Sequence, residues 1–401
     1  MELICLGIIF LVIIAFLALR RPLYEAIAGG LAGTALLFHI PLTECIRMPL
    51  SLFGDWNSMA IVLSLYLITY LQQMMEARSL IRQSQDDLNG LFHNRRVNAA
   101  GASLFMGLMP SAASTLICGS IVRDTAEDYL DAREQAFVAS WFRHIPESTL
   151  PTYTGVLLMA SLSGVALPGF ILSMVVPLVV LALLGFAFVL RKLPKDPGTP
   201  LSQNRLLDLL HLFQHLWPLL LILALILIFH IGVVPAVLVS MAGTAVVYRF
   251  SAKELLPMLH TAFDWKLLLN TYIVLVLKEY IAYTGVLKLL PEMLSRLPIP
   301  SFLIFALLFF LGGIVSGTNG IIALGTPLAF AAIPDGGAPL MMLLMCMCHA
   351  ASQISPTHVC LAVAADCFHI SIGDLVRKTL PISLVFACYM VCYYMLLTTL
   401  L

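Results

Sequence analysis

Long apolar runs separated by short polar stretches make up most of the chain. An α-helix needs roughly 20 apolar residues to cross a bilayer, and ten runs come near that length. They cover residues 3–19, 24–38, 58–72, 136–164, 167–190, 206–229, 234–248, 267–284, 339–365 and 380–401. The pattern predicts an all-α polytopic membrane protein whose amphipathic connections lie at the membrane surface.

Two further apolar segments, residues 97–122 and 301–330, contain polar clusters that a continuous transmembrane helix does not need. The cluster of the second segment is Ser316, Gly317, Thr318 and Asn319. That of the first is Ser111, Ser114 and Thr115. Non-helical backbone inside a membrane is tolerated only where it is buried in protein or lines a cavity. We therefore predict two re-entrant hairpins with polar tips near the midplane. Closely packed helices rich in small residues are the alternative.

Prolines interrupt two of the expected spans, residues 136–164 and 339–365, because they break the intrahelical hydrogen-bond ladder. A half-helix that begins at such a break directs N–H groups with partial positive charge at the membrane centre, which suits a carboxylate. Freed carbonyls suit a small cation such as sodium. The break residues expected at this substrate and ion site are Pro151, Thr152, Ser355, Pro356 and Thr357. The alternative is a pair of kinked helices that only pack.

The two halves of the chain repeat the same order of elements. Ala32-Gly33-Thr34-Ala35 recurs as Ala242-Gly243-Thr244-Ala245, an offset of 210, and Pro151-Thr152 recurs as Pro356-Thr357, an offset of 205. We predict a first repeat over residues 1–190, a cytoplasmic linker over 191–205 and a second repeat over 206–401. Each repeat holds five spans and one hairpin. An odd number of crossings inverts the second repeat relative to the first, as in many transporters.

The basic residues predict the orientation of this arrangement. Of the 22 Lys and Arg residues, seventeen fall in loops on one side and three (Arg47, Lys288 and Arg296) on the other, while Arg143 and Lys278 lie within spans. Cytoplasmic loops carry the excess of basic residues, so we predict an inner-membrane protein with both termini outside. Basic residues follow the first run rather than precede it, which indicates a retained helix and not a signal peptide.

The amino-acid composition is that of a membrane protein, and the motifs that the sequence lacks argue against several classes of function. Hydrophobic residues make up 60% of the 401 positions and charged residues 11%, against about a quarter charged in soluble domains. No basic block indicates nucleic acid as a partner. The chain has no phosphate-binding loop, no H-E-x-x-H motif and no G-x-S-x-G elbow. We interpret the nine cysteines and the His211/His215 pair as structural, since no further metal ligand accompanies them. These absences favour a gradient-driven transporter without a cofactor over a pump or an enzyme.

Five ionisable residues in or beside the spans are candidates for charge or proton coupling. A charge at the bilayer centre costs about 2.5–3.5 kcal/mol on insertion scales, so it needs a partner or a water-filled cavity. The five are Arg143, Glu147, Lys278, Glu279 and His358. Arg143 and Glu147 are four residues apart, and on one helix they would share a face. Either Arg143 contacts an anionic substrate, or the pair reaches the membrane surface by snorkelling.

Architecture and motifs together resemble the ion transporter superfamily, which includes citrate, dicarboxylate and gluconate symporters and some sodium/proton antiporters. The resemblance rests on five spans and a hairpin per half, on the second tip, and on Ile354-Ser355-Pro356-Thr357-His358 at the second break. Within that group the chain is most similar to an uncharacterised prokaryotic integral-membrane family. The resemblance implies two inverted repeats, sodium and carboxylate binding at the tips, and a homodimer.

The sequence therefore predicts a secondary active transporter that moves a small organic anion, a carboxylate, across the inner membrane by alternating access. Sodium or protons would be the coupling ion. A cation/proton antiporter is the alternative in the same class, and its function would depend on the ionisable residues. A membrane enzyme or a non-transporting scaffold is the alternative from another class, although no nucleophile–base pair stands out in the sequence.

Overall fold

The computed structural model describes residues 2–19, 21–84, 87, 93–108, 112–196, 204–294, 296, 298–356 and 358–400. Every regular element in this part of the chain is a helix, which confirms the all-α class. Five of these helices are long and apolar enough to cross a membrane. A sixth span results if residues 318–332 and 334–352, bent by 103°, are taken as one. The other expected spans fall on shorter helices. The protein is a multi-pass membrane protein.

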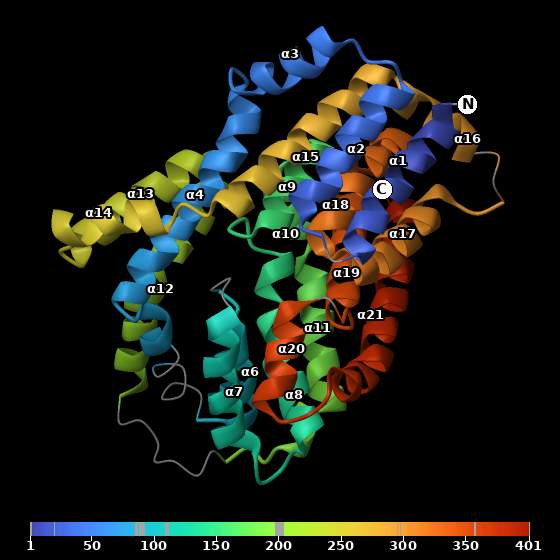
Figure 1. Ribbon diagram of the computed structural model, residues 1–401. Coiled ribbons are helices and arrows are strands. Elements are labelled where there is room, and N and C mark those ends of the chain that lie inside the picture. The colour runs from blue at the N-terminus through green and yellow to red at the C-terminus, as the bar shows by residue number, and fades with distance from the viewer. Residues whose placement is uncertain are drawn as a thin grey trace.

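The first half of the chain forms helices of unequal length (Figure 1). They are α1 (Glu2–Ala18), α2 (Leu23–Leu37), α3 (Leu42–Leu52), α4 (Trp56–Ala77), α6 (Arg95–Met106), α7 (Ala112–Ala126), α8 (Ala132–Arg143), η1 (Pro146–Ser148), α9 (Thr154–Ser163), α10 (Leu167–Ser173), α11 (Val175–Phe188) and η2 (Leu190–Lys192). Aspartate caps set two of the starts, because a carboxylate satisfies free N–H groups of the first turn. Asp55 caps α4 and Asp131 caps α8.

The second half of the chain is also helical. It comprises α12 (Arg205–Leu227), α13 (Val233–Val247), α14 (Ala252–Thr261), α15 (Trp265–Thr284), η3 (Val286–Leu289), α16 (Leu290–Leu294), α17 (Ser301–Ser316), α18 (Thr318–Ala332), η4 (Pro334–Gly336), α19 (Gly337–Ser352), α20 (Val359–Cys367) and α21 (Ile372–Leu400). In Figure 1, α12, α13 and α14 lie on the side of α4, whereas α17, α19 and α21 lie on the opposite side. Large apolar side chains such as Leu172 and Val246 are exposed, as lipid contact requires.

α6 and α7 run antiparallel to each other. At their outer ends, the Arg95 guanidinium donates to the carbonyl of Thr125 at 2.8 Å. Nearer their other ends, the Cys118 thiol donates to the Ser103 hydroxyl at 3.2 Å. At 12 residues, α6 is too short to cross a bilayer, which takes roughly 20 residues.

α17 and α18 form a second antiparallel pair that turns at Gly317. Phe309 packs against Gly325, and Ile321 packs against Gly312, so the two helices lie in contact along their length. Gly317 has φ 74° and ψ 163°, a backbone conformation that glycine adopts freely and other residues avoid. Neither helix, at 16 and 15 residues, reaches the roughly 20 residues of a full span.

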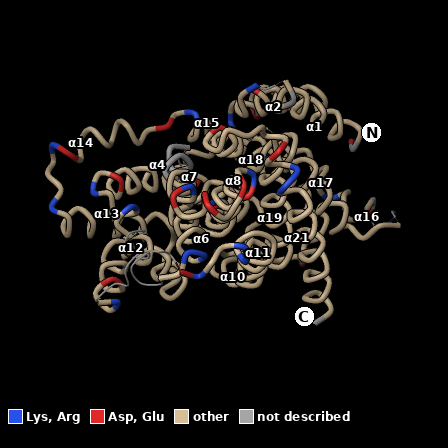
Figure 2. The backbone as a smooth tube through the Cα atoms, turned by 90° about the horizontal axis from the view of Figure 1, so that it is seen from below, with Lys and Arg blue, Asp and Glu red and all other residues tan. Residues whose placement is uncertain are grey.

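Acidic and basic residues gather around the ends of α7 and α8 when the molecule is viewed from below (Figure 2). Glu134 lies in the first turn of α8, before its apolar part, and is only 4% exposed. Its carboxylate accepts hydrogen bonds from Lys192 at 2.5 Å and from Lys378 at 2.7 Å. Since Lys192 follows α11 and Lys378 belongs to α21, one carboxylate joins three parts of the chain.

This ion cluster has a defined dependence on pH. Burial raises the pKa of Glu134, but the hydrogen bonds from Lys192 and Lys378 outweigh that effect and hold the pKa below its ordinary value. The unfolded chain titrates near the ordinary value of about 4.3. A carboxyl group with a lowered folded-state pKa contributes stability that is present above the unfolded pKa. That contribution is lost as the pH falls through the folded pKa.

We predict that Glu134→Gln lowers the thermal unfolding midpoint of the detergent-solubilised protein at neutral pH. The loss should correspond to about 1–3 kcal/mol, because two ammonium groups lose a charged acceptor. The deficit relative to wild type should shrink as the midpoint is measured at lower pH, where the wild-type carboxylate becomes protonated. Glu127, exposed on the connection between α7 and α8, provides the control, and Glu127→Gln should leave the midpoint unchanged. Equal midpoints for wild type and Glu134→Gln at neutral pH would contradict the prediction.

Candidate functional site

Two helical breaks lie opposite each other at the centre of the site. The first break separates α8, which ends at Arg143, from α9, which begins at Thr154, and the short turn η1 lies between them. The second break separates α19, which ends at Ser352, from α20, which begins at Val359. Both fall in the segments that contain the prolines.

Among the described residues, three contacts between polar side chains join the segments at the two breaks, and we call them the cross-break contacts. Their atom pairs are His144 Nε2 with His358 Nε2 at 2.8 Å, Ser148 Oγ with His349 Nδ1 at 3.1 Å, and Arg143 Nη1 with Cys360 Sγ at 3.4 Å. Each pair combines a residue of the first half with a residue of the second. Buried polar groups are costly unless they are hydrogen-bonded, so the breaks stabilise each other.

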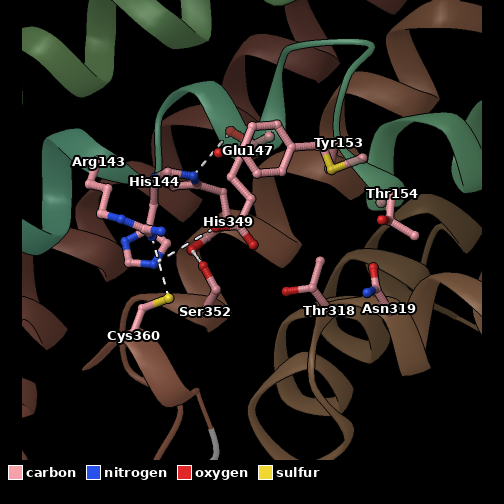
Figure 3. Close-up of a pocket in the computed structure, with 13 residues that line it drawn as sticks. Arg143, His144, Glu147, Tyr153, Thr154, Thr318, Asn319, His349, Ser352 and Cys360 are labelled. Atoms are coloured by element: carbon pink, nitrogen blue, oxygen red, sulfur yellow. Dashed lines mark hydrogen bonds and ion pairs between the residues drawn. The ribbon is translucent and has the colours of Figure 1, made fainter. Parts of the chain in front are cut away.

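A cavity of about 210 Å³ lies between the breaks and the turn of α17 and α18. Its polar and charged lining comes from the first break, from the starts of α9 and α18, and from α19 and α20. The residues are Arg143, His144, Glu147, Ser148, Tyr153, Thr154, Thr318, Asn319, His349, Ser352 and Cys360. In Figure 3, Arg143, His144 and Cys360 lie on one side and Thr154, Thr318 and Asn319 on the other. Cationic and imidazole groups thus face hydroxyl and amide groups.

Three helices begin at or beside this cavity. They are α9, α18 and α20, and none has a side-chain hydrogen bond at its N-cap. Gly155, in the first turn of α9, lies against Thr318 and Asn319, in the first turn of α18. The first N–H groups of a helix lack an intrahelical acceptor and carry partial positive charge. The cavity therefore offers backbone donors in addition to its side chains.

Arg143 supplies a full positive charge at this site. The residue is 2% exposed, so it does not snorkel to the membrane surface. The expectation that Arg143 and Glu147 share a helix face is also wrong, because α8 ends at Arg143. The Glu147 side chain is 30% exposed, and its carboxylate lies 3.8 Å from His144 Nε2. A charge held inside a membrane protein is costly, and it marks a functional site by default.

The second tip contributes two of its four expected residues to the cavity. Thr318 and Asn319 line it. Ser316 does not, because its hydroxyl donates to the carbonyl of Gly312 at 2.7 Å, and Gly317 forms the turn. At the first tip, Ser111 and the side chains of Ser114 and Thr115 lie outside the described residues.

The expected break residues are spread more widely than the sequence suggests. Thr152 lines a neighbouring cavity of about 260 Å³. The Ser355 hydroxyl donates at 2.8 Å to a carbonyl of α17, which ties the second break to that helix. Pro151 is buried in the turn before α9, and Pro356 is exposed. Thr357 lies outside the described residues.

Two ionisable pairs lie in other places. Lys278 and Glu279 line a separate cavity of about 600 Å³, so the structure does not bring them to the site at the breaks.

The histidine pair of α12, His211 and His215, has an acidic neighbour, so the interpretation that no further ligand-type residue accompanies this pair is wrong. His215 Nδ1 lies 2.7 Å from a carboxylate oxygen of Asp87, and His211 Nδ1 lies 3.8 Å from the other.

The structure also brings His349, Ser352 and Cys360 to the site, together with His144, Ser148, Tyr153 and Thr154 from the first break and the start of α9. The sequence contained an indication of His349, because this residue is the single histidine in the apolar, Met-rich segment 339–351. An ionisable group in such a segment is a candidate for function. The sequence contained no indication of Cys360, since cysteine commonly packs as a small apolar residue. Only the fold places its thiol beside the imidazoles of His144 and His358.

Nearly the whole chain, residues 3–397, matches one family model. The chain belongs to the DUF401 family. The description of that family is a protein of unknown function. No curated protein matches the sequence.

Among solved structures, this DUF401 protein is similar to the YdaH transporter of Alcanivorax borkumensis, whose structure is described as having an unusual topology. The TM-score is 0.59 at 14% sequence identity, over 88% of this chain and 87% of that one. At this identity the likeness shows a shared fold. The resemblance to citrate, dicarboxylate and gluconate symporters stays a prediction.

Gly107 provides a test of how the first helix pair meets the first break. Its carbonyl accepts a hydrogen bond from the Tyr153 hydroxyl, and a Cβ at this position would collide with the backbone carbonyl of Arg143. No rotamer change relieves a clash with backbone. We predict that Gly107→Ala lowers the thermal unfolding midpoint by the equivalent of about 1–3 kcal/mol. Gly7→Ala is the matched control, because no atom lies within 4 Å of a Cβ there. Equal midpoints for the two variants would refute the contact.

Proposed function

We propose that this protein is a secondary transporter of a small organic anion, a carboxylate, coupled to sodium or protons. The observation that carries the proposal is the cavity at the breaks, where Arg143 and three uncapped helix starts converge. The fold shared with the YdaH transporter supports transport as the class of function. An anion is the ligand that best complements a cationic side chain together with free backbone N–H groups.

The size and the chemistry of the cavity narrow the substrate. At about 210 Å³, the cavity is smaller than the roughly 300–1,000 Å³ of sites for drug-sized ligands. A small carboxylate fits this volume better than a nucleotide or a peptide. The Arg143 guanidinium can hold one carboxylate in a bidentate manner, and Thr318 and Asn319 can donate to a second polar group across the cavity.

We infer that two inverted repeats, residues 1–190 and 206–401, surround this site. Helix lengths and spacings support the inference. α2 and α13 each have 15 residues and begin at residues 23 and 233, an offset of 210. α9 and α20 begin at residues 154 and 359, an offset of 205. Thr34 and Thr244 each donate at 2.7 Å to the carbonyl four residues earlier.

An inverted pair of repeats suits alternating access, because rocking of the halves can expose a central site first to one side and then to the other. We place both termini on the outer side and residues 191–205 on the cytoplasmic side, as the distribution of basic residues predicts. Both chain ends lie in the upper half of Figure 1, in keeping with this orientation. The homodimer stays a prediction from the resemblance.

We predict that a carboxylate from a panel of small mono-, di- and tricarboxylates raises the thermal unfolding midpoint of the purified protein, since a ligand that binds only the folded state stabilises it. The shift should be larger in sodium, or at lower pH if protons are coupled. It should disappear in Arg143→Gln and decrease in Asn319→Ala. Arg191→Gln, an exposed arginine near the end of α11, should keep the full shift.

The ligand-induced shift, rather than the midpoint of the free protein, is the decisive quantity, because loss of a buried arginine also changes stability. Uptake of the same acid into proteoliposomes, driven by an imposed sodium or proton gradient, then tests transport itself. A panel that shifts nothing at any sodium concentration or pH would refute the anion site. So would a full shift in Arg143→Gln.

A further inference from the structure

We propose that His144, His358 and Cys360 form a binding site for a borderline-soft transition-metal ion, Zn²⁺ above all, at the junction of the two breaks. Among the residues that the structure describes, these three are the one group of His, Cys, Asp or Glu whose ligand atoms all lie within 4.8 Å of one another. The site lies beside the anion cavity, and His144 and Cys360 also line that cavity.

The distances suit a tetrahedral ion after small side-chain rotations. Zn²⁺ binds imidazole nitrogen at about 2.0–2.1 Å and thiolate sulfur at about 2.3 Å, so neighbouring donors lie about 3.3–3.6 Å apart. The two Nε2 atoms are now 2.8 Å apart, and an ion between them requires the rings to part by about 0.5 Å. The distances from each Nε2 atom to the Cys360 sulfur are at most 4.8 Å, so each exceeds the bound-state spacing by no more than about 1.2 Å.

His144 is already oriented as a metal ligand. Its Nδ1 lies 2.6 Å from the backbone carbonyl oxygen of Ser140. A carbonyl oxygen only accepts hydrogen bonds, so Nδ1 carries the proton and donates it. The Nε2 atom therefore carries the lone pair and accepts the hydrogen bond from His358 Nε2, a position that an ion would take when the His358 proton leaves. A hydrogen bond from the second ring nitrogen to a carbonyl is the usual way in which proteins fix the tautomer and the direction of a ligating histidine.

The surroundings favour a soft ion over a hard one. Sodium, magnesium and calcium prefer oxygen donors, whereas imidazole and thiolate select zinc and its neighbours. The Arg143 guanidinium lies 3.4 Å from the Cys360 sulfur, a contact that suits a thiolate. Glu147, 3.8 Å from His144 Nε2, can provide a fourth ligand. One thiolate and one carboxylate then balance the divalent charge.

Binding at this place has a structural consequence. His144 follows α8 in the first half, while His358 and Cys360 begin α20 in the second half. An ion held by all three would link the halves and stabilise the arrangement seen here. If the protein is a transporter as proposed above, zinc would slow it by opposing the relative motion of the halves.

The experiment uses the full-length, detergent-purified protein after chelator treatment, with Co²⁺ as a spectroscopic substitute for Zn²⁺. We expect one equivalent of Co²⁺ to produce visible bands of a thiolate-bound, tetrahedral ion. Zn²⁺ should displace these bands, protect Cys360 from maleimide and raise the thermal unfolding midpoint. Cys360→Ser should remove the thiolate band and weaken Zn²⁺ binding by about tenfold or more, because one of three ligands is lost.

Two controls make the result specific. Cys388→Ser removes an exposed thiol of α21 and should leave the bands and the affinity unchanged. His144→Gln removes a second ligand and should weaken binding as Cys360→Ser does. If it does not fold, the pair Cys360→Ser and Cys388→Ser still decides the matter. No thiolate band in the wild type, or an unchanged band in Cys360→Ser, would overturn the proposal.

The same samples separate this inference from the proposed anion site. The carboxylate-induced midpoint shift is measured in the metal-free protein and in Cys360→Ser. Metal binding without any carboxylate shift would leave the metal site standing and remove the anion transporter. A carboxylate shift without metal binding would do the reverse.

Discussion

The centre of this protein depends on one constraint: a bilayer offers no water to the polar groups of an interrupted helix. Both breaks leave backbone and side-chain groups that need partners. The cross-break contacts supply them, since His144 meets His358 and Ser148 meets His349. The most polar parts of the two halves are therefore stable only together. The surrounding apolar helices meet the same requirement internally, through their own backbone hydrogen bonds.

The same constraint accounts for the cavity. The starts of α9, α18 and α20 lack side-chain caps, and a buried arginine lies beside them. Such an arrangement lowers stability, and proteins retain it at places where a ligand completes the hydrogen bonding. The anion that we propose would fill this role, and its release would restore the cost. Because part of the binding free energy offsets this cost, the affinity for the anion is expected to be moderate. A transporter needs such an affinity in order to release its substrate.

The polar centre has two chemically different sides. Toward Thr318 and Asn319 it offers hydroxyl, amide and backbone donors, which suit an oxygen-rich ligand. Toward Cys360 it offers imidazole nitrogen and sulfur, which suit a softer metal. Arg143 lies on the second side, where it donates to the Cys360 sulfur, and it lines the cavity that the two sides share. Occupation of one side is thus expected to influence the other through this side chain.

The amino-acid pattern was enough to predict the helical membrane class, the turn at Gly317, and Arg143, Thr318 and Asn319 as candidate residues. These features depend on local patterns, because apolar length, glycine conformation and a charge in an apolar segment all act within a few residues. Which of these groups share the site follows from how the helices pack. Ser316 donates to its own helix, Ser355 donates to α17, and Cys360 lies beside an arginine 217 positions earlier. Each polar side chain bonds to a hydrogen-bond partner close to it in space. Packing between segments that are remote in the sequence determines which partners are close.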